Sequence, residues 1–172
     1  MFVIIFFLVA CADRNPPPPP TFSQFLYSQT SMTKQLEDLN SKLTVEILYS
    51  KMEGHRNFDR IVSLKLQNKP VIVGVSQANR DNPYFVDLLK DASTKPIGKI
   101  LFSKDSGVTR DPNMRVEKIN LSAISDVIVR TYMMNLGYSN QDVIYKRTSI
   151  FHKDKESMQV IEYVLPSIHN WL

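Results

Sequence analysis

The sequence predicts an α+β fold built around an antiparallel sheet. Segments rich in β-branched and aromatic residues come in hairpin pairs, 58–67 with 71–76 and 143–151 with 158–165. Helical segments lie between the hairpins, which favours separated helices and an antiparallel sheet over a parallel one. The 172 residues are 43% hydrophobic and 22% charged, enough apolar material for one domain with a core of its own.

The remaining elements follow from local signals. Asn82 followed by Pro83 is typical of a helix start, because proline at the first helical position lacks only an amide that has no partner there. Gly137 is suited to end the helix before it. The expected helices are 28–39 with Thr30 or Ser31 as cap, 83–92, a short apolar helix within 95–102, and 120–136 as the longest; further strands are expected at 43–49 and 114–119.

One carboxylate interrupts the apolar stretch 160–166. Strand side chains alternate, so Glu162 shares a face with Val160 and Val164, and the opposite face is apolar too. An ionised carboxylate in such a strand costs several kcal/mol unless it is paired or hydrogen-bonded. Two explanations stay open, a structural partner such as an arginine or backbone amides, and a functional acid.

Arg60 lies on the more apolar face of the segment 58–67, with Val62, Leu64 and Leu66. It is either a side chain that reaches solvent from the end of its strand or a cation that faces the interior. An interior arginine would supply a charge complementary to Glu162.

Composition excludes several classes of protein. The net charge is +4 from 21 basic and 17 acidic residues, and no cluster of Lys and Arg interleaved with aromatics occurs, so no nucleic-acid partner is expected. His55, His152 and His169 stand apart from one another, and no group has metal-ligand spacing. No glycine-rich phosphate loop is present. We therefore expect no cofactor and no metal.

The amino terminus predicts export. Residues 1–10 are apolar and uncharged, as in a signal peptide, and residues 8–11 resemble the lipobox of bacterial lipoproteins, with Cys11 as the lipidated residue. No basic residue precedes the apolar run, so an accidental apolar terminus and a cytoplasmic protein stay open as the alternative. The predicted organisation is a lipoprotein signal peptide at 1–10, a lipid-anchored proline-rich tether at 11–25 and a domain at 26–172. Such a protein would face the periplasm on a bacterial membrane, and Ala12 favours the outer one.

The order and spacing of several segments resemble those of the bacterial chorismate–pyruvate lyases over roughly residues 28–166. The matching features are Ser31-Met32-Thr33-Lys34, the strand 43–48, Arg60 ten residues before Pro70, the segment 95–102, Thr109-Arg110-Asp111, Lys146-Arg147, and Glu162 before Leu165-Pro166. Residues 123–166 also look like the second half of the ligand-sensing domains of GntR-type regulators, which share the fold.

The resemblance implies a single antiparallel sheet with helices packed on one face, and a lyase that eliminates pyruvate from chorismate to give 4-hydroxybenzoate, a step of ubiquinone biosynthesis. Glu162 would be the catalytic acid and Arg60 the carboxylate anchor. Met32, Ile97 and Arg147 would join them in binding the substrate. A monomer is expected. The alternative is a membrane-tethered, non-catalytic lipoprotein that binds an aromatic or other carboxylated small molecule on the same fold.

Overall fold

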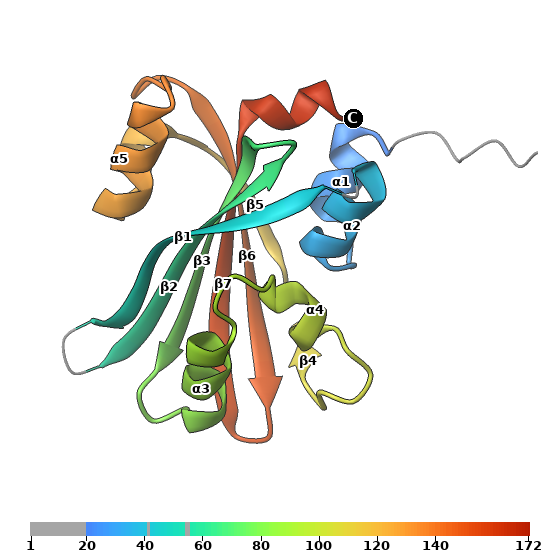
Figure 1. Ribbon diagram of the computed structural model, residues 1–172, viewed down its shortest axis with the longest axis vertical. Helices are drawn as coiled ribbons and strands as arrows, with labels where there is room; N and C mark the ends of the chain where they lie inside the picture. Colours follow the sequence, from blue (N-terminus) through green and yellow to red (C-terminus); the bar gives the residue numbers. More distant parts are fainter. Residues whose placement is uncertain (1–19, 41, 54–55) are drawn as a thin grey trace, which may run out of the picture.

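The computed structural model describes residues 20–40, 42–53 and 56–172. The predicted signal peptide at 1–10 and the lipidation site at Cys11 lie outside these residues. The described chain forms one sheet with the strand order β1-β2-β3-β7-β6-β4, and β5 pairs with β6 beside β4 (Figure 1). Every neighbouring pair is antiparallel. The predicted α+β class with a single antiparallel sheet is confirmed.

The strands are β1 (Leu43–Glu53), β2 (Asn57–Leu66), β3 (Lys69–Asn79), β4 (Thr109–Arg110), β5 (Arg115–Asn120), β6 (Val143–Lys153) and β7 (Glu156–Val164). The helices are α1 (Phe22–Tyr27), α2 (Met32–Leu39), α3 (Pro83–Asp91), α4 (Ile97–Leu101) and α5 (Val127–Asn135), with 3₁₀ turns η1 (Leu121–Ala123) and η2 (Pro166–Asn170).

Tight turns fix the register of the two predicted hairpins. Gln67 and Asn68 both have positive φ, 46° and 66°, between β2 and β3. Such a turn matches the twist of the strands that it joins. Asp154, with φ 53°, turns β6 into β7. Both hairpins form as predicted, and β3 pairs with β7, so the two hairpins share one continuous sheet.

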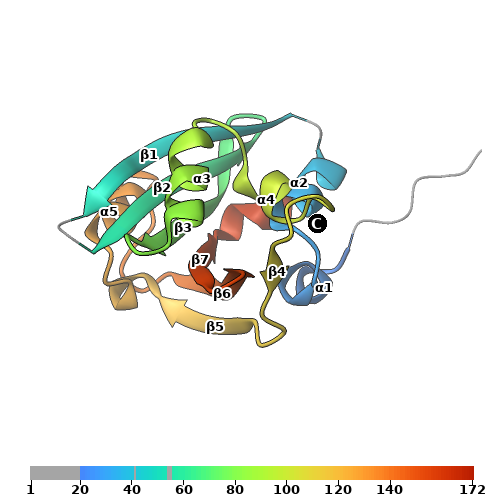
Figure 2. The same ribbon diagram turned by 90° about the horizontal axis from the view of Figure 1, so that it is seen from below.

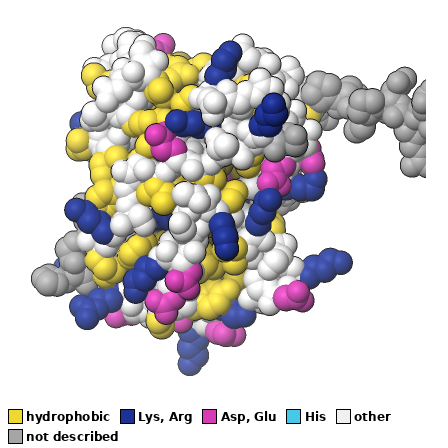
Figure 3. All heavy atoms as spheres, viewed as in Figure 1, with side chains coloured by type: hydrophobic (Ala, Val, Ile, Leu, Met, Phe, Trp, Pro, Cys, Tyr) yellow, Lys and Arg dark blue, Asp and Glu magenta, His cyan; other side chains and the backbone are white. Residues whose placement is uncertain are grey.

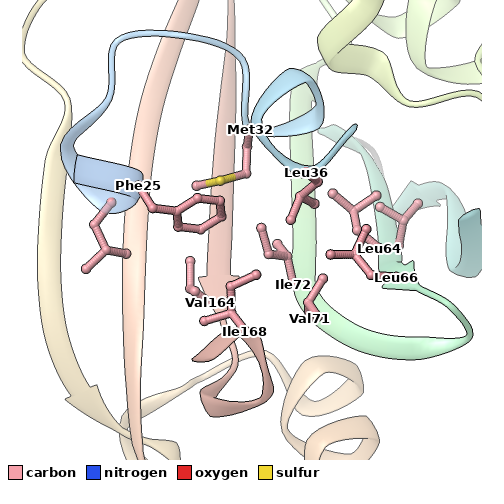
Figure 4. Packing of buried hydrophobic residues seen from close by; sticks show 11 residues of the cluster. Phe25, Met32, Leu36, Leu64, Leu66, Val71, Ile72, Val164 and Ile168 are labelled. Atoms are coloured by element: carbon pink, nitrogen blue, oxygen red, sulfur yellow. The ribbon is translucent and has the colours of Figure 1, made fainter. Parts of the chain in front are cut away.

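Helices α1 to α4 cover one face of this sheet. Figure 2 shows that the sheet is curved, with β1, β2 and β3 on one side and β6, β5 and β4 on the other. On the inner face, Phe25 and Leu36 of α1 and α2 pack against Ile72 and Val164 (Figure 4). Helices α3 and α4 extend the same face through a second cluster around Phe85. This covered face contains the cavity described below.

Helix α5 packs on the opposite face. Its buried residues Val129 and Met133 contact Ile61, Val73 and Tyr163, which alternate with the inner-face residues of their strands. The hydroxyl of Tyr132 donates to Ser63 Oγ at 2.9 Å. The fold therefore adds one helix on the outer face to the four on the inner face.

The predicted helix 120–136 is wrong in its extent. The chain forms a single 3₁₀ turn at 121–123, and α5 begins only after Asp126, whose carboxylate accepts the Val129 amide at 3.0 Å. Asp126 is a strong N-cap, and it overrides the apolar periodicity of the preceding residues. Gly137 ends this segment with φ 94°, as expected.

The boundary of the folded domain lies earlier than predicted. Residues 22–25 were expected in the tether 11–25, but they begin helix α1, which carries a capping box between Thr21 and Gln24. Phe25 has no exposed surface. Helix α2 correspondingly starts after Ser31 rather than at residue 28. Phe25 is therefore a core residue, and Phe22 is partly buried against the same cluster.

The visible surface carries mixed charges. On the face shown in Figure 3, basic and acidic side chains are interspersed among apolar ones. No helix within the described ranges is long and apolar enough to cross a membrane.

Candidate functional site

A cavity lies between the inner face of the sheet and helices α2 and α4. The five residues that the sequence analysis singled out, Met32, Arg60, Ile97, Arg147 and Glu162, all line it. They come from β2, β6, β7 and the first residues of α2 and α4. The structure thus brings together residues up to 130 positions apart, while their roles in binding stay predictions.

Arg60 is almost completely buried, with 1% of its surface exposed. Its Nη2 donates to the carbonyls of Ser93 at 2.7 Å and Lys95 at 3.1 Å, in the loop before α4. Its Nε is buried without a hydrogen-bond partner. Burial lowers the pKa of Arg60 to about 10. The interior placement replaces the alternative in which Arg60 reaches solvent.

No carboxylate of the described chain forms an ion pair with Arg60. Its hydrogen-bond partners are neutral carbonyl oxygens, and its Nε is left without an acceptor. A buried guanidinium in this state is costly, because burial removes water that only a matched anion replaces fully.

Glu162 has the structural partner that the sequence left open. It lies directly across the ladder from Arg147, and Arg147 Nη1 is 3.3 Å from Glu162 Oε2. Burial raises the pKa of Glu162, and the positive charges of Arg147 and Arg110 oppose that rise. The side chain of Glu162 is 17% exposed and lines the cavity, so the pairing with Arg147 leaves the carboxyl group accessible from the cavity.

Arg147 also ties the loop before α2 to the sheet. Its Nη2 donates to the carbonyls of Ser28 at 3.1 Å and Thr30 at 3.3 Å. With 1% of its surface exposed, Arg147 connects the carboxylate of β7 to the chain that leads into α2. A change at Glu162 therefore acts on a residue that also positions this loop.

Two glycines shape the cavity. Gly74 lies across the ladder from Glu162, and a Cβ there would meet Val62 at an ordinary 3.5 Å. Its missing side chain therefore leaves open space beside the carboxylate. Gly98 has the opposite role, because a Cβ there would come within 2.5 Å of Ser31 Oγ and 2.6 Å of Thr33 Oγ1. Glycine at 98 thus lets α4 approach the start of α2.

Met32 and Ile97 occupy the first positions of α2 and α4. Met32 is 2% exposed, and Figure 4 shows its side chain directed toward Phe25. It is therefore a core residue as well as a lining residue. Ile97 is half-buried and packs against the cluster around Phe85.

The sequence analysis missed Arg110 as a site residue. Arg110 lies in β4 and lines the cavity. Its Nη2 donates to the backbone carbonyl oxygen of Gln29 at 2.5 Å and to the side-chain oxygen of the same residue. Its guanidinium lies 5.3 Å from the ring centroid of Phe102. The signal was present, since Thr109-Arg110-Asp111 is one of the segments that carry the family resemblance.

The cavity is small. The cavity has a volume of about 50 Å³. One water needs roughly 10–15 Å³ of such space, so the closed cavity accommodates about four waters or a compact organic group. Within the described residues no three His, Cys, Asp or Glu side chains gather as metal ligands.

The chain is similar in structure to bacterial regulator domains. The C-terminal domain of the histidine utilization repressor from Pseudomonas syringae pv. tomato superposes with a TM-score of 0.54 at 15% identity, over 73% of this chain and 93% of that one. Gene product SA0254 of Staphylococcus aureus gives 0.55 at 9% identity, over 81% and 90%. The possible transcriptional regulator YydK of Bacillus subtilis gives 0.50 at 12% identity, over 78% and 61%.

The sequence matches no protein-family model and no curated protein. The structural matches show that the chain has the chorismate lyase-like fold, a single open antiparallel sheet with a few helices. They overturn the expected chorismate–pyruvate lyase activity and its place in ubiquinone biosynthesis, because two of the three similar structures are named as transcriptional regulators and none as a lyase. They lend no support to the predicted lipid anchor.

Proposed function

We propose that this domain is a ligand-sensing module that binds a small anionic molecule in the cavity through Arg60. The observation that carries the proposal is the state of Arg60, which is 1% exposed, lacks an ion-pair partner among the described residues, and keeps its Nε without an acceptor. A protein that only needed to fill this space would gain from an apolar side chain there.

The chemistry of the guanidinium selects the ligand. Its planar fork of donors matches a carboxylate or another oxyanion in two parallel hydrogen bonds, which are shorter and stronger than bonds to neutral acceptors. Two of the donors of Arg60 are already directed at the carbonyls of Ser93 and Lys95, so the anion would bind at the remaining edge.

The small size of the cavity and the fold support sensing by a compact ligand. Buried Ser149 offers an additional hydroxyl that has no hydrogen-bond partner within the described chain, and it lines the same cavity. The similar domain from Pseudomonas syringae belongs to a protein that is named as a histidine utilization repressor. By analogy, ligand occupancy would be the signal that this domain transmits.

Binding by the full chain tests the proposal. Isothermal titration and thermal shift with propionate, butyrate and benzoate should show saturable binding to the wild type, and Arg60→Met should abolish it. Arg115→Met is the matched control, because Arg115 is an exposed arginine of β5 outside the cavity. Its binding curves should match those of the wild type.

Two results would refute the proposal. One is the absence of binding for every acid by folded wild-type protein. The other is binding that persists unchanged in folded Arg60→Met, since the anion would then be held elsewhere.

A further inference from the structure

Arg110 is a second cation at the cavity that forms no salt bridge within the described residues, although the charge of Glu162 acts on it from a greater distance. Arg60, Arg110 and Arg147 line the cavity, and Glu162 is the only acidic residue that does so among the described residues. Glu162 is paired with Arg147. Arg110 instead donates to the neutral amide side chain and backbone carbonyl of Gln29.

The two arginines that form no salt bridge, Arg60 and Arg110, lie on opposite sides of the curved sheet. Arg60 belongs to β2, near one edge of the strand order, and Arg110 belongs to β4, at the other edge. Figure 2 shows β2 and β4 on different sides of the curved sheet, and residues of both strands line the cavity. A ligand held by Arg60 would therefore extend across the cavity toward Arg110.

Arg110 lies at the outer end of the cavity. Phe102, which its guanidinium covers, is 40% exposed, whereas Arg60 is 1% exposed. Phe102, Ser31 and Gly98 also line a neighbouring groove on the solvent side, together with Gln29, Thr30, Lys34, Glu37 and Lys99. The cavity and the groove therefore adjoin where the first residues of α2 and α4 meet, and Gln29, the partner of Arg110, lines the groove.

We infer that Arg110 is a specificity-determining residue that binds a second anionic group of the ligand. The ligand is therefore a dianion rather than a monoanion. The inference rests on the proposed function, since Arg60 must hold the first anionic group. The formal charges of the lining residues support it, because three arginines and one glutamate leave a net charge of +2. A dianion neutralises this excess and a monoanion leaves half of it.

The small size of the cavity also supports a ligand contact with Arg110. The cavity volume of about 50 Å³ accommodates one small anionic group beside Arg60 and little more. Phe102 lines both the cavity and the groove, so a longer ligand would extend toward the groove beside Phe102 and Arg110. Arg110 can exchange its neutral partner Gln29 for an anionic one by side-chain rotation, because it is only half-buried.

Matched pairs of acids test the inference on the full chain. Butyrate and succinate have the same number of carbons, as do hexanoate and adipate, and each pair differs by the second carboxylate. Isothermal titration should show the dianion of at least one pair binding about tenfold more tightly than its monoanion, the scale of one hydrogen bond to a charged group at a half-exposed site.

Variants of Arg110 assign the preference to this residue. Arg110→Gln should remove the tenfold preference for the dianion, and Arg110→Lys should restore part of it. Arg115→Gln is the control for loss of a positive charge, and it should keep the preference. Gln29→Ala should also keep it, since the amide only holds Arg110 in the free protein.

The outcomes separate this inference from the proposed function. Arg60-dependent binding of monoanions without any gain for dianions overturns the role of Arg110 and leaves the proposed function intact. A dianion preference that survives in Arg110→Gln also overturns it. Failure of all four acids to bind the wild type overturns both.

Discussion

Replacing Arg60 by methionine should stabilise the protein while it destroys the proposed ligand site. Burial lowers the pKa of Arg60 from 12.5 to about 10, which corresponds to about 3 kcal/mol of free energy spent to keep the buried group charged. Methionine has a similar length, fills irregular space and needs no hydrogen bonds. The substitution loses the two bonds from Nη2 to the carbonyls of Ser93 and Lys95, which offset part of the gain.

The expected net effect is an increase of about 1–2 kcal/mol in the free energy of unfolding. For a domain of this size, each kcal/mol corresponds to roughly 2–4 °C in Tm. Urea unfolding at pH 7, followed by circular dichroism, measures the change. Arg115→Met, an exposed substitution of the same type, should stay within about 0.5 kcal/mol of the wild type.

A loss of more than about 1 kcal/mol in Arg60→Met would refute the reasoning. Arg60 would then be a structural residue that holds the loop before α4, where Ser93 has the unfavourable φ of 44°. In that case its missing ion-pair partner would carry no information about a ligand.

Three further predictions concern packing, protonation and the domain boundary. Gly98→Ala should cost about 1–3 kcal/mol in thermal unfolding because its Cβ would overlap Ser31 Oγ, whereas the matched Gly74→Ala should cost under 1 kcal/mol; equal effects would contradict the close approach of α2 and α4. Burial raises the pKa of Glu162 in the folded state above its ordinary value of 4.5. The free energy of unfolding of the wild type, measured by urea titration relative to Glu162→Gln, should therefore fall as the pH rises from 4.5 toward 7. An increase over this range would mean that the charge of Arg147 outweighs burial and lowers the pKa. A chain that starts at residue 26 lacks the fully buried Phe25, so its free energy of unfolding should be lower by about 3 kcal/mol or more than that of a chain that starts at residue 20. Equal denaturation midpoints for the two chains would mean that residues 20–25 are part of the tether and not of the folded domain.

Local signals in the sequence predicted most of the elements correctly. The hairpin β2–β3, helix α3 after Asn82 and the closing hairpin β6–β7 were all predicted near their observed bounds. Alternation and turn chemistry act over a few residues, so they can be recognised without the rest of the fold. The extent of α5 was mispredicted because one cap residue, Asp126, outweighed a longer apolar pattern.

The candidate site was predicted in part. Arg60 and Glu162 could be identified because each places a charge on an apolar strand face, a local conflict that is visible in the sequence. Arg110 could not be identified in this way, because β4 has only two residues and shows no periodicity. The pairing of Glu162 with Arg147 depends on the register between β6 and β7, which places these residues opposite each other.

The sequence by itself determined the α+β class, the hairpins and the presence of two charges that needed an explanation. Only the tertiary structure decided which charge was satisfied. Strand register gave Glu162 its arginine. The packing of the loop before α4 placed Arg60 beside neutral carbonyls, and the order of the strands placed β2 and β4 near opposite edges of the sheet. Charge balance in a cavity depends on side chains that meet from distant segments, so it follows from packing and not from any local pattern.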